Sequence, residues 1–321
     1  MSITTIIVTF NREALIERCL KAVIEQSYKP KNILVINNAS TDGTEERLKL
    51  ATESNTDTNA KETLIKLNEI NGVSIYLYNK EKNTGGSGGF NKGMEVAEKQ
   101  LCADYYWMMD DDGYPSEECL DKLIKTATEK KCDYLMPVSI DIDNHKQLSW
   151  AMRKKNGKKT ISYDEIKKSW GDIWNYVTPF NGVLLSADCV SKVGYINKDF
   201  FIWGDEYEHY WRCRKAGYFP ITDLNAQFYH PAAKLPLVPI VGGLMNVPFV
   251  DSPMRMICYV RNHTYIYLHY HGKWKIAARM LMYTWLYVIT RKGDWKYLRL
   301  YFQSVKDGFK GNFTRHLKYM K

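Results

Sequence analysis

Three consecutive aspartates, Asp110 to Asp112, directly follow an aromatic and apolar run, Tyr105 to Met109. Such a run is typical of a buried strand. Because an unpaired buried charge is costly, we expect the strand to end where the carboxylates begin. In an open α/β sheet, ligands bind at the edge where strands end. The triplet therefore predicts an α/β fold with a polar site at the carboxyl edge of its sheet.

The three adjacent carboxylates also indicate what the site binds. Like charges repel one another, and a divalent cation relieves that repulsion. Oxygen-rich sites suit Mg²⁺ and Mn²⁺, which bridge protein carboxylates to phosphates. The alternative is a polar turn that binds nothing, because Asp112-Gly113 is a common turn pair.

Strand-like and helix-like segments alternate over the first half of the chain. We expect strands at 2–10, 32–37, 73–78, 105–109 and 134–140, helices at 13–26 and 116–130, another helix after a turn at 40–43, and a surface loop or frayed helix end at 51–63. This alternation predicts a Rossmann-like, mostly parallel sheet with helices on both faces. Further along we expect an irregular region at 141–178, a strand at 178–186, a helix at 206–216 and a long loop at 231–252.

Positive charge is concentrated at the C-terminal end. The 321 residues carry a net charge of +9, whereas residues 253–321 contain 14 Lys/Arg and 2 Asp/Glu, a net of +12. Residues 1–252 therefore have 31 basic and 34 acidic residues, a net of −3. We expect a ligand-binding domain at 1–252 and a separate basic helical segment at 253–321, with helices near 253–271, 273–291 and 293–310.

The basic segment also contains 15 aromatic residues. Its apolar stretch 279–289 is flanked by Lys273, Lys275 and Arg291, which suits a helix at an anionic membrane surface. Packing against the rest of the chain and contact in a homo-oligomer are alternatives. Binding of single-stranded nucleic acid is a further one, but the net negative charge of residues 1–252 disfavours nucleic acid.

The remaining composition favours a cytoplasmic protein. No apolar stretch reaches the ~20 residues that span a bilayer, and the first residues do not resemble a signal peptide. The seven cysteines include no CxxC pair and are odd in number, which favours a reducing compartment and argues against a structural zinc site.

A second candidate site is the glycine-rich stretch 83–93, Asn-Thr-Gly-Gly-Ser-Gly-Gly-Phe-Asn-Lys-Gly. Glycines let the backbone approach a ligand, and its N–H groups can point at phosphate oxygens. The spacing matches neither a Walker loop nor GxGxxG. A flexible loop without a ligand is the alternative.

Two further candidates lie later in the chain. Asp205, Glu206 and Glu208 begin a helix just after Trp203. Acids there often only pair with the helix dipole; one of them could instead be a general base beside an aromatic platform for a sugar. The sequence leaves the choice between Asp205 and Glu206 open. His230 ends a strand-like stretch, and a single histidine is usually structural.

Together these segments resemble the inverting GT-A-fold glycosyltransferases of family 2, most closely the bacterial galactofuranosyltransferases. The resemblance covers roughly residues 2–262. It rests on Thr9-Phe10-Asn11-Arg12, on Asn37-Asn38-Ala39-Ser40-Thr41-Asp42-Gly43-Thr44, on 83–93, on the Asp triplet, on Asp205-Glu206 near Trp203, and on His230. The form Gly-Gly-Ser-Gly-Gly-Phe leans toward galactofuranose rather than rhamnose transfer.

The resemblance implies a role for each matching residue. Asp110, Asp112 and His230 would bind Mn²⁺ or Mg²⁺, and Asp205 would be the catalytic base. Trp203 and Glu206 would meet the acceptor. The nucleotide-sugar donor would be bound by Thr9, Phe10, Asn11, Arg12, Asn38, Asn83, Gly85, Gly86, Asn91, Lys92 and Asp111. Relatives often carry a second acid where this chain has Gly204, and that departure bears on the assignment of Asp205.

The implied activity is metal-dependent transfer of galactofuranose from UDP-galactofuranose to a lipid-linked cell-surface glycan, at the inner face of the plasma membrane. A rhamnosyl- or other hexosyltransferase of the same fold is the alternative. From another class, the chain could be a non-catalytic glycan- or nucleic-acid-binding protein, which we would expect to have lost the triplet or the base. A Rossmann dehydrogenase is disfavoured because no GxGxxG follows the first strand.

Overall fold

The computed structural model describes residues 1–177, 181–232 and 235–320. The chain divides into two compact units. The first comprises Met1–Ile196 and Arg212–Ala233, and the second comprises Asn197–Trp211 and Lys234–Lys321. The expected boundary at residue 252 lies inside the second unit, and the segment with Asp205 belongs to that unit as well.

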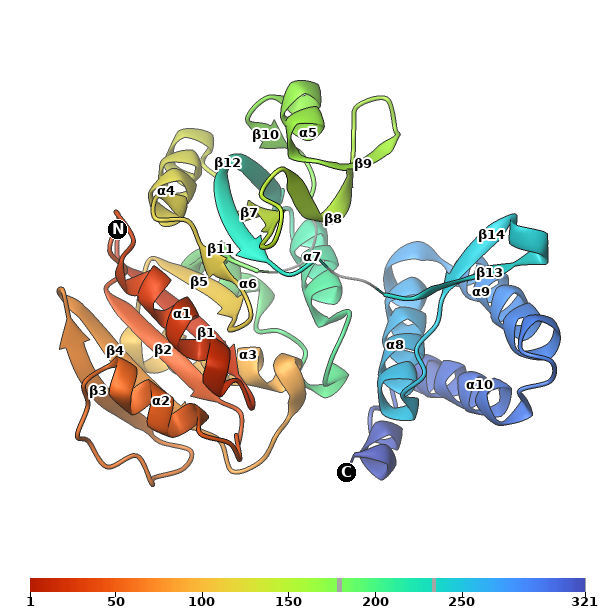
Figure 1. The fold of residues 1–321 in the computed structure, drawn as a ribbon, viewed down its shortest axis with the longest axis horizontal. Helices are drawn as coiled ribbons and strands as arrows, with labels where there is room; N and C mark the ends of the chain where they lie inside the picture. The colour runs from red at the N-terminus through yellow and green to blue at the C-terminus, as the bar shows by residue number, and fades with distance from the viewer. Residues whose placement is uncertain (178–180, 233–234, 321) are drawn as a thin grey trace. The chain divides into compact units, whose positions relative to one another are not determined.

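The first unit is built on one large sheet (Figure 1). Its strands are β1 (Ile3–Thr9), β2 (Asn32–Asn37), β3 (Leu64–Ile70), β4 (Val73–Asn79), β5 (Tyr105–Asp110), β6 (Tyr114–Pro115), β7 (Tyr134–Asp141), β8 (Gln147–Arg153), β9 (Lys159–Ser162), β10 (Ile173–Trp174), β11 (Val183–Ser186) and β12 (Ile221–His230). The order across the sheet is β10-β12-β7-β11-β5-β1-β2-β4-β3, with β6 beside β12 and β8 between β7 and β9. Strands β1, β2, β4, β5, β7 and β12 run in one direction, whereas β3, β10 and β11 run antiparallel to their neighbours. The predicted mostly parallel sheet is confirmed.

Helices cover both faces of this sheet (Figure 1). The first unit contains α1 (Glu13–Ile24), α2 (Thr44–Ala51), α3 (Gly85–Val96) with a π-helical turn Ala97–Leu101, α4 (Cys119–Lys130), α5 (Tyr163–Trp170) and α6 (Ala187–Val193). Alternate residues of β1 show the two faces, as the period of two in a strand requires. Ile3 and Ile7 share a core with α1 and α4, whereas Ile6 and Val8 contact the glycines of α3.

Several expected boundaries were wrong. The described residues 141–177 are not irregular, because most of them form β8, β9, α5 and β10. The strands there are short edge strands, so their apolar residues show only a weak period of two. Strand β3 was missed because it is a half-exposed edge strand with polar residues. The strand expected at 178–186 begins at Val183 (β11); residues 178–180 lie outside the described part of the chain.

The second unit consists of helices and a hairpin. It contains α8 (Pro253–Ile266), α9 (Lys273–Trp285) and α10 (Trp295–Lys310), the first two extended by π-helical turns Tyr267–His271 and Leu286–Thr290, then a 3₁₀ helix Arg315–Tyr319. The 3₁₀ turn Lys198–Phe200 and the first part of α7 (Asp205–Lys215) also belong to it. Three C-terminal helices were predicted and are present.

The expected loop at 231–252 is only partly a loop. It contains the antiparallel hairpin β13 (Leu237–Ile240) and β14 (Met245–Pro248), joined by a 3₁₀ turn Val241–Gly243. Prolines are tolerated in such an isolated pair because each strand has a free edge. Residues 233–234 of that stretch lie outside the described residues.

Over the described chain, none of the helices has the length and apolar content required to cross a membrane.

Candidate functional site

The parallel strands of the first unit end in polar residues along one edge. β1 ends at Thr9, β2 at Asn37, β4 at Asn79, β5 at Asp110, β7 at Asp141 and β12 at His230. The register places Thr9 beside Asn37 and Asp141 beside His230, so these ends lie along the same edge of the sheet. The predicted polar carboxyl edge is therefore present, and the Asp triplet begins on it.

A tight crossing of two chain segments brings Asp112 to His230. β6 pairs antiparallel with β12, with Tyr114 opposite Tyr229. A Cβ added to Gly113 would lie 2.7 Å from the Tyr229 carbonyl oxygen, too close for any side chain at this position. With glycine there, Asp112 Oδ1 lies 3.2 Å from His230 Nε2.

The tautomer of His230 follows from its other nitrogen. Nδ1 lies 2.7 Å from the carbonyl oxygen of Pro231, which can only accept, so Nδ1 carries the proton and donates it. In the neutral ring, Nε2 then presents a lone pair to Asp112 Oδ1, which is buried and makes no well-aligned hydrogen bond. Two facing acceptors need a proton or a cation, and a histidine oriented by a backbone carbonyl is the usual arrangement in metal sites. The pair therefore fits a divalent cation.

The charge state of Asp112 suits that role. Burial alone would raise the pKa of Asp112, but a proton on His230 Nε2 and the charge of Arg12 hold it below its ordinary value. The ring of His230 is fixed by stacking on Trp150, with centroids 4.8 Å apart. Trp150 lies on β8, in the region expected to be irregular, which is why its place beside His230 was not predicted.

Asp111 has a different environment from its neighbours. Its side chain is buried; Oδ1 lies 3.6 Å from Arg12 Nε, and Oδ2 has no hydrogen-bond partner among the described residues. Burial, assisted by the charge of Asp112, raises the pKa of Asp111 to about 7 against the opposing effects of Thr9 and Arg12. A buried carboxyl oxygen without a partner can accept a hydrogen bond from a ligand hydroxyl.

The predicted three-residue ligand set is only partly assembled. Among the described residues, no group of three or more His, Cys, Asp or Glu side chains is arranged to hold a metal ion. The structure brings together Asp112 and His230. Asp110 lies at the end of β5, where its backbone N–H donates to Asn181 Oδ1 at 3.2 Å.

Asn38 ties the end of β2 to the start of α3 rather than lying open. Its Nδ2 donates to Asn83 Oδ1 and to the carbonyl oxygen of Gly85, each at 3.0 Å, and its Oδ1 accepts from Thr84 N at 3.2 Å. The Asn38 amide therefore holds the end of β2 against Asn83, Thr84 and Gly85 at the start of α3.

The segment after β1 is held in a similar way. Asn11, at φ 53°, exchanges hydrogen bonds with the turn after β2: its backbone N–H donates to Ser40 Oγ at 3.0 Å and its Oδ1 accepts from Thr41 N at 2.8 Å. The side chains of Phe10 and Arg12 remain substantially exposed beside Thr9.

The glycine-rich stretch is a helix and not the flexible loop that was one of its two interpretations. Residues 85–96 form α3, and its glycines serve helix–sheet packing. A Cβ on Gly89 would lie 2.5 Å from Val8 Cγ1, and one on Gly93 would lie 2.5 Å from Ile6 Cγ2. A Cβ on Gly86 would meet nothing within 4 Å. The stretch thus brings the start of α3 close to the sheet edge, and Gly86 is the position with open space.

Asn91 and Lys92 lie further along α3 and contact protein groups. Asn91 Nδ2 donates to the carbonyl oxygen of Ile196 at 2.7 Å, and Lys92 Nζ pairs with Glu95 at 2.8 Å. Buried Lys80, which the sequence analysis did not single out, donates to the carbonyl oxygen of Gly88 at 3.2 Å and to Thr84 Oγ1, and so fixes the start of α3.

In the second unit, Asp205 is the first residue of α7 and is buried. Glu206 Oε2 accepts from the backbone N–H of Gly204 at 3.1 Å, and Glu208 Oε1 accepts from Tyr270 Oη at 2.7 Å. Glu206 therefore has a helix-capping contact, as acids at this position often do. Trp203 packs edge-on against Tyr259, with centroids 6.1 Å apart.

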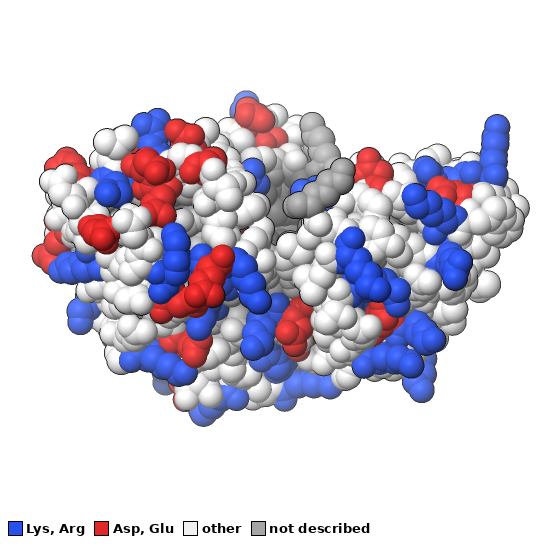
Figure 2. All heavy atoms as spheres, turned by 90° about the horizontal axis from the view of Figure 1, so that it is seen from below, with Lys and Arg blue, Asp and Glu red and all other residues white. Residues whose placement is uncertain are grey.

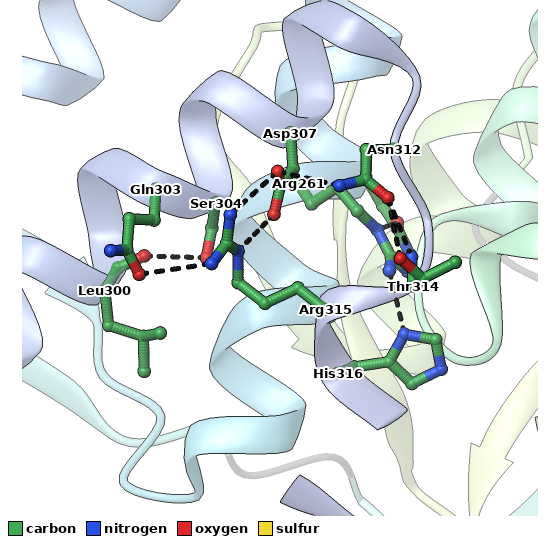
Figure 3. A network of polar contacts seen from close by, with 10 residues as sticks. Arg261, Leu300, Gln303, Ser304, Asp307, Asn312, Thr314, Arg315 and His316 are labelled. Carbon is green, nitrogen blue, oxygen red and sulfur yellow. Dashed lines mark hydrogen bonds and ion pairs between the residues drawn. The ribbon is translucent and has the colours of Figure 1, made fainter. Parts of the chain in front are cut away.

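Sequence reasoning also missed the buried pair Arg261 and Asn262 on α8, both 0% exposed. They lie in a polar network with His316, and nearby Asp307 pairs with Arg315 (Figure 3). The signal was present, because a charged and an amide residue directly follow the apolar run 256–260 inside a predicted helix.

Comparison with known proteins gives a consistent result. A family model described as "Glycosyl transferase family 2" matches residues 4–187. Galactofuranosyltransferase GlfT1 of Mycolicibacterium smegmatis is 27% identical over 318 residues, covering 98% of each chain. GlfT1 of Mycobacterium tuberculosis is 26% identical over 305 residues, covering 93% of this chain and 94% of the relative.

Solved structures match at the level of the fold. S. aureus TarS 1–349 in complex with UDP has a TM-score of 0.51 and 16% identity, covering 84% of this chain and 67% of TarS. The mannosyltransferase PcManGT from Pyrobaculum calidifontis, in complex with GDP-Man and Mn²⁺, has a TM-score of 0.51 and 15% identity, covering 96% and 86%. The predicted GT-A fold is confirmed.

Proposed function

This chain belongs to glycosyl transferase family 2, and we propose that it is an inverting, metal-dependent enzyme that transfers galactofuranose from UDP-galactofuranose to a hydroxyl of a glycan. The observation that carries the proposal is the Asp112–His230 pair, whose facing acceptors lie 3.2 Å apart on the carboxyl edge. The names of the relatives that match nearly the whole chain support the donor sugar.

The residues of the first unit would bind the donor. Asp112 and His230, joined by Asp110, would hold a divalent cation, which when bound neutralises charge on the leaving diphosphate. Asp111 and Arg12 would bind donor hydroxyl or phosphate groups, with Asp111 accepting through its unpartnered Oδ2. The other residues that we propose to contact the donor are Thr9, Phe10, Asn11, Gly85 and Gly86.

Asp205 would act as the general base. It takes the proton from the acceptor hydroxyl while that oxygen attacks the anomeric carbon from the face opposite the leaving group. One displacement inverts the configuration and needs no covalent enzyme intermediate. We assign Trp203 and Glu206 to acceptor binding, and the capping contact of Glu206 to Gly204 favours Asp205 over Glu206 as the base.

The proposal is tested by donor binding and UDP release across a panel of nucleotide sugars, with Mn²⁺, with Mg²⁺ and with EDTA. Metal-dependent selectivity for UDP-galactofuranose is the expected result. Preference for another nucleotide sugar would replace the donor and favour the rhamnosyl- or hexosyltransferase alternative. If no donor binds, a non-catalytic glycan-binding role becomes the better interpretation.

We further propose that the second unit contacts an anionic membrane surface on the cytoplasmic side, where a lipid-linked acceptor would be available. Four exposed apolar side chains, Trp274, Leu281, Trp285 and Ile289, follow one another along α9 and its π-helical end at intervals of seven, four and four residues. These intervals place them on one stripe of a helix. Lys273, Lys275, Arg291 and Lys292 flank the stripe. Such a stripe with basic ends suits the interface of an anionic bilayer.

Surface charge agrees with this assignment. On the face shown in Figure 2, acidic and basic side chains mingle over the first unit, whereas basic ones are more prominent over the C-terminal helices. Flotation with vesicles rich in phosphatidylserine is the test, because such anionic lipid attracts basic segments. Binding lost in Trp285→Ser and Leu281→Ser would support it. Absence of flotation together with a dimer in light scattering would instead assign the stripe to an oligomer contact.

A further inference from the structure

The backbone just before Asp205 adopts conformations that most side chains avoid. Phe201 has φ 68° and Trp203 has φ 63°, both in the left-handed region, and Gly204 follows with φ 88°. Bulky residues are uncommon there, and such a backbone persists only where its surroundings impose it. Something in the second unit must therefore fix residues 200–204.

The buried side-chain amide of Asn262 makes most of the contacts that hold this backbone. Asn262 Nδ2 lies 3.0 Å from the carbonyl oxygen of Phe200, 2.9 Å from that of Ile202 and 2.8 Å from that of Trp203. The nitrogen has two hydrogens, so the three carbonyls share them, and Asn262 itself is 0% exposed. Three of the four carbonyls of residues 200–203 thus accept hydrogen bonds from α8.

Arg261 fixes the direction of that amide. Its Nε donates to Asn262 Oδ1 at 2.8 Å, which leaves the amide nitrogen pointing to the loop, and its Nη2 donates to the Phe200 carbonyl oxygen at 2.8 Å. Its Nη1 lies 3.0 Å from His316 Nδ1 (Figure 3). Burial and the charge of Arg261 lower the pKa of His316 to about 4, so the ring is neutral and accepts from the guanidinium.

We propose that Asn262, aligned by Arg261, is a positioning residue for the base: it fixes the backbone of residues 200–203 and thereby the place of the Asp205 carboxylate. This inference rests on the proposed assignment of Asp205. Only Gly204 separates Asp205 from the last carbonyl that Asn262 holds, so a change at residue 262 reaches the carboxylate directly. A displacement of about 1 Å in a reacting group can cost about 100-fold in rate.

The test compares Asn262→Ala with Thr264→Val in the full-length chain. Thr264 lies on the same helix, is also buried, and uses its hydroxyl only for the carbonyl oxygen of Val260 at 2.8 Å. UDP release from UDP-galactofuranose gives kcat and donor KM, and thermal unfolding gives Tm. We expect Asn262→Ala to lower kcat by about 10- to 100-fold with donor KM changed less than about twofold. Thr264→Val should leave both constants unchanged.

A double-mutant cycle separates positioning from general loss of structure. If Asn262 acts through Asp205, Asn262→Ala should have almost no further effect on kcat in the Asp205→Asn background. An equal loss in both backgrounds would overturn the inference and leave the proposed function intact. A wild-type rate in Asp205→Asn alone would instead overturn the base assignment. If Asn262→Ala does not fold, Arg261→Lys is the second variant, with the same expected cycle.

Discussion

The two acidic regions of this molecule are built in opposite ways. At the sheet edge, the carboxylates of Asp111 and Asp112 each have a buried oxygen without a hydrogen-bond partner among the described residues. Before Asp205, by contrast, the carbonyl groups of Phe200, Ile202 and Trp203 in an unusual backbone accept hydrogen bonds from Asn262. The first region has acceptors that the proposed cation and donor would satisfy, whereas in the second region the protein satisfies the carbonyl groups itself. A group that binds a charged ligand gains from such a deficit, while a group that removes a proton needs a fixed position.

The largest effect on the rate of transfer should come from a change at Asp205. Asp205→Asn removes the proposed base and should lower transfer by about 10²- to 10⁴-fold. Donor binding should stay nearly intact, because the residues that we propose to bind the donor belong to the first unit. UDP release and donor titration measure the two quantities, with Asp199→Asn as the control at an exposed acid. Loss of donor binding in Asp205→Asn would show that the two regions are not separate in function.

A change at the sheet edge should instead weaken binding of the proposed cation. Asp112→Asn removes the anion that faces His230, and UDP release should fall by about 10²- to 10³-fold, as expected when several kcal/mol of charge stabilisation are lost. Binding of Mn²⁺ in the presence of UDP, followed by electron paramagnetic resonance, should weaken in parallel. Exposed Asp143 offers the control variant Asp143→Asn. Unchanged Mn²⁺ binding in Asp112→Asn would contradict the assignment of the pair.

The packing of α3 against the sheet gives a third comparison, between two glycines of the same helix. Gly89→Ala places a Cβ 2.5 Å from Val8 Cγ1 and should destabilise the fold by about 1–3 kcal/mol through overpacking. Gly86→Ala meets open space and should be neutral or stabilise by up to about 1 kcal/mol through helix propensity. Chemical denaturation measures both. Equal changes in the free energy of unfolding would show that close contact with the sheet does not require glycine at position 89.

The stability conferred by the buried network of Arg261, Asn262 and His316 should be sensitive to acid. The pKa of His316 is lowered from 6.5 to about 4, so the folded chain binds fewer protons than the unfolded chain between these values. Stability should therefore fall as the pH drops from 6.5 toward 4, by roughly 1 kcal/mol per pH unit from this residue. Denaturation at pH 7.5 and 5 should show a smaller difference in His316→Asn than in wild type, and no such reduction in His145→Asn. A pH response that His316→Asn leaves unchanged would assign the acid sensitivity to other groups.

The sequence predicted the parts that depend on short-range pattern. The carboxyl edge was predictable because apolar runs end abruptly in polar residues, as at Asp110 and Asn37. The meeting of Asp112 with His230 was not derivable from pattern, since it depends on Gly113 fitting against the backbone of Tyr229. It came only from the family resemblance.

The glycine-rich stretch shows the limit of composition. Flexibility and close packing need the same residue, so the sequence could not separate a loop from the first turns of α3. Arg261 and Asn262 illustrate another limit: their partners lie in residues 200–203 and 316, and no local period links such distant positions.

Gly86 has a practical consequence. Because a side chain there meets no atom within 4 Å and the backbone is not left-handed, the position can carry a reporter group at the start of α3. Five of the seven cysteines are buried, Cys132 is partly buried, and Cys102 is exposed. A Gly86→Cys chain with Cys102→Ser would therefore accept a fluorophore mainly at one place. Its emission would then test whether the donor reaches the start of α3, as proposed for Gly86, independently of turnover.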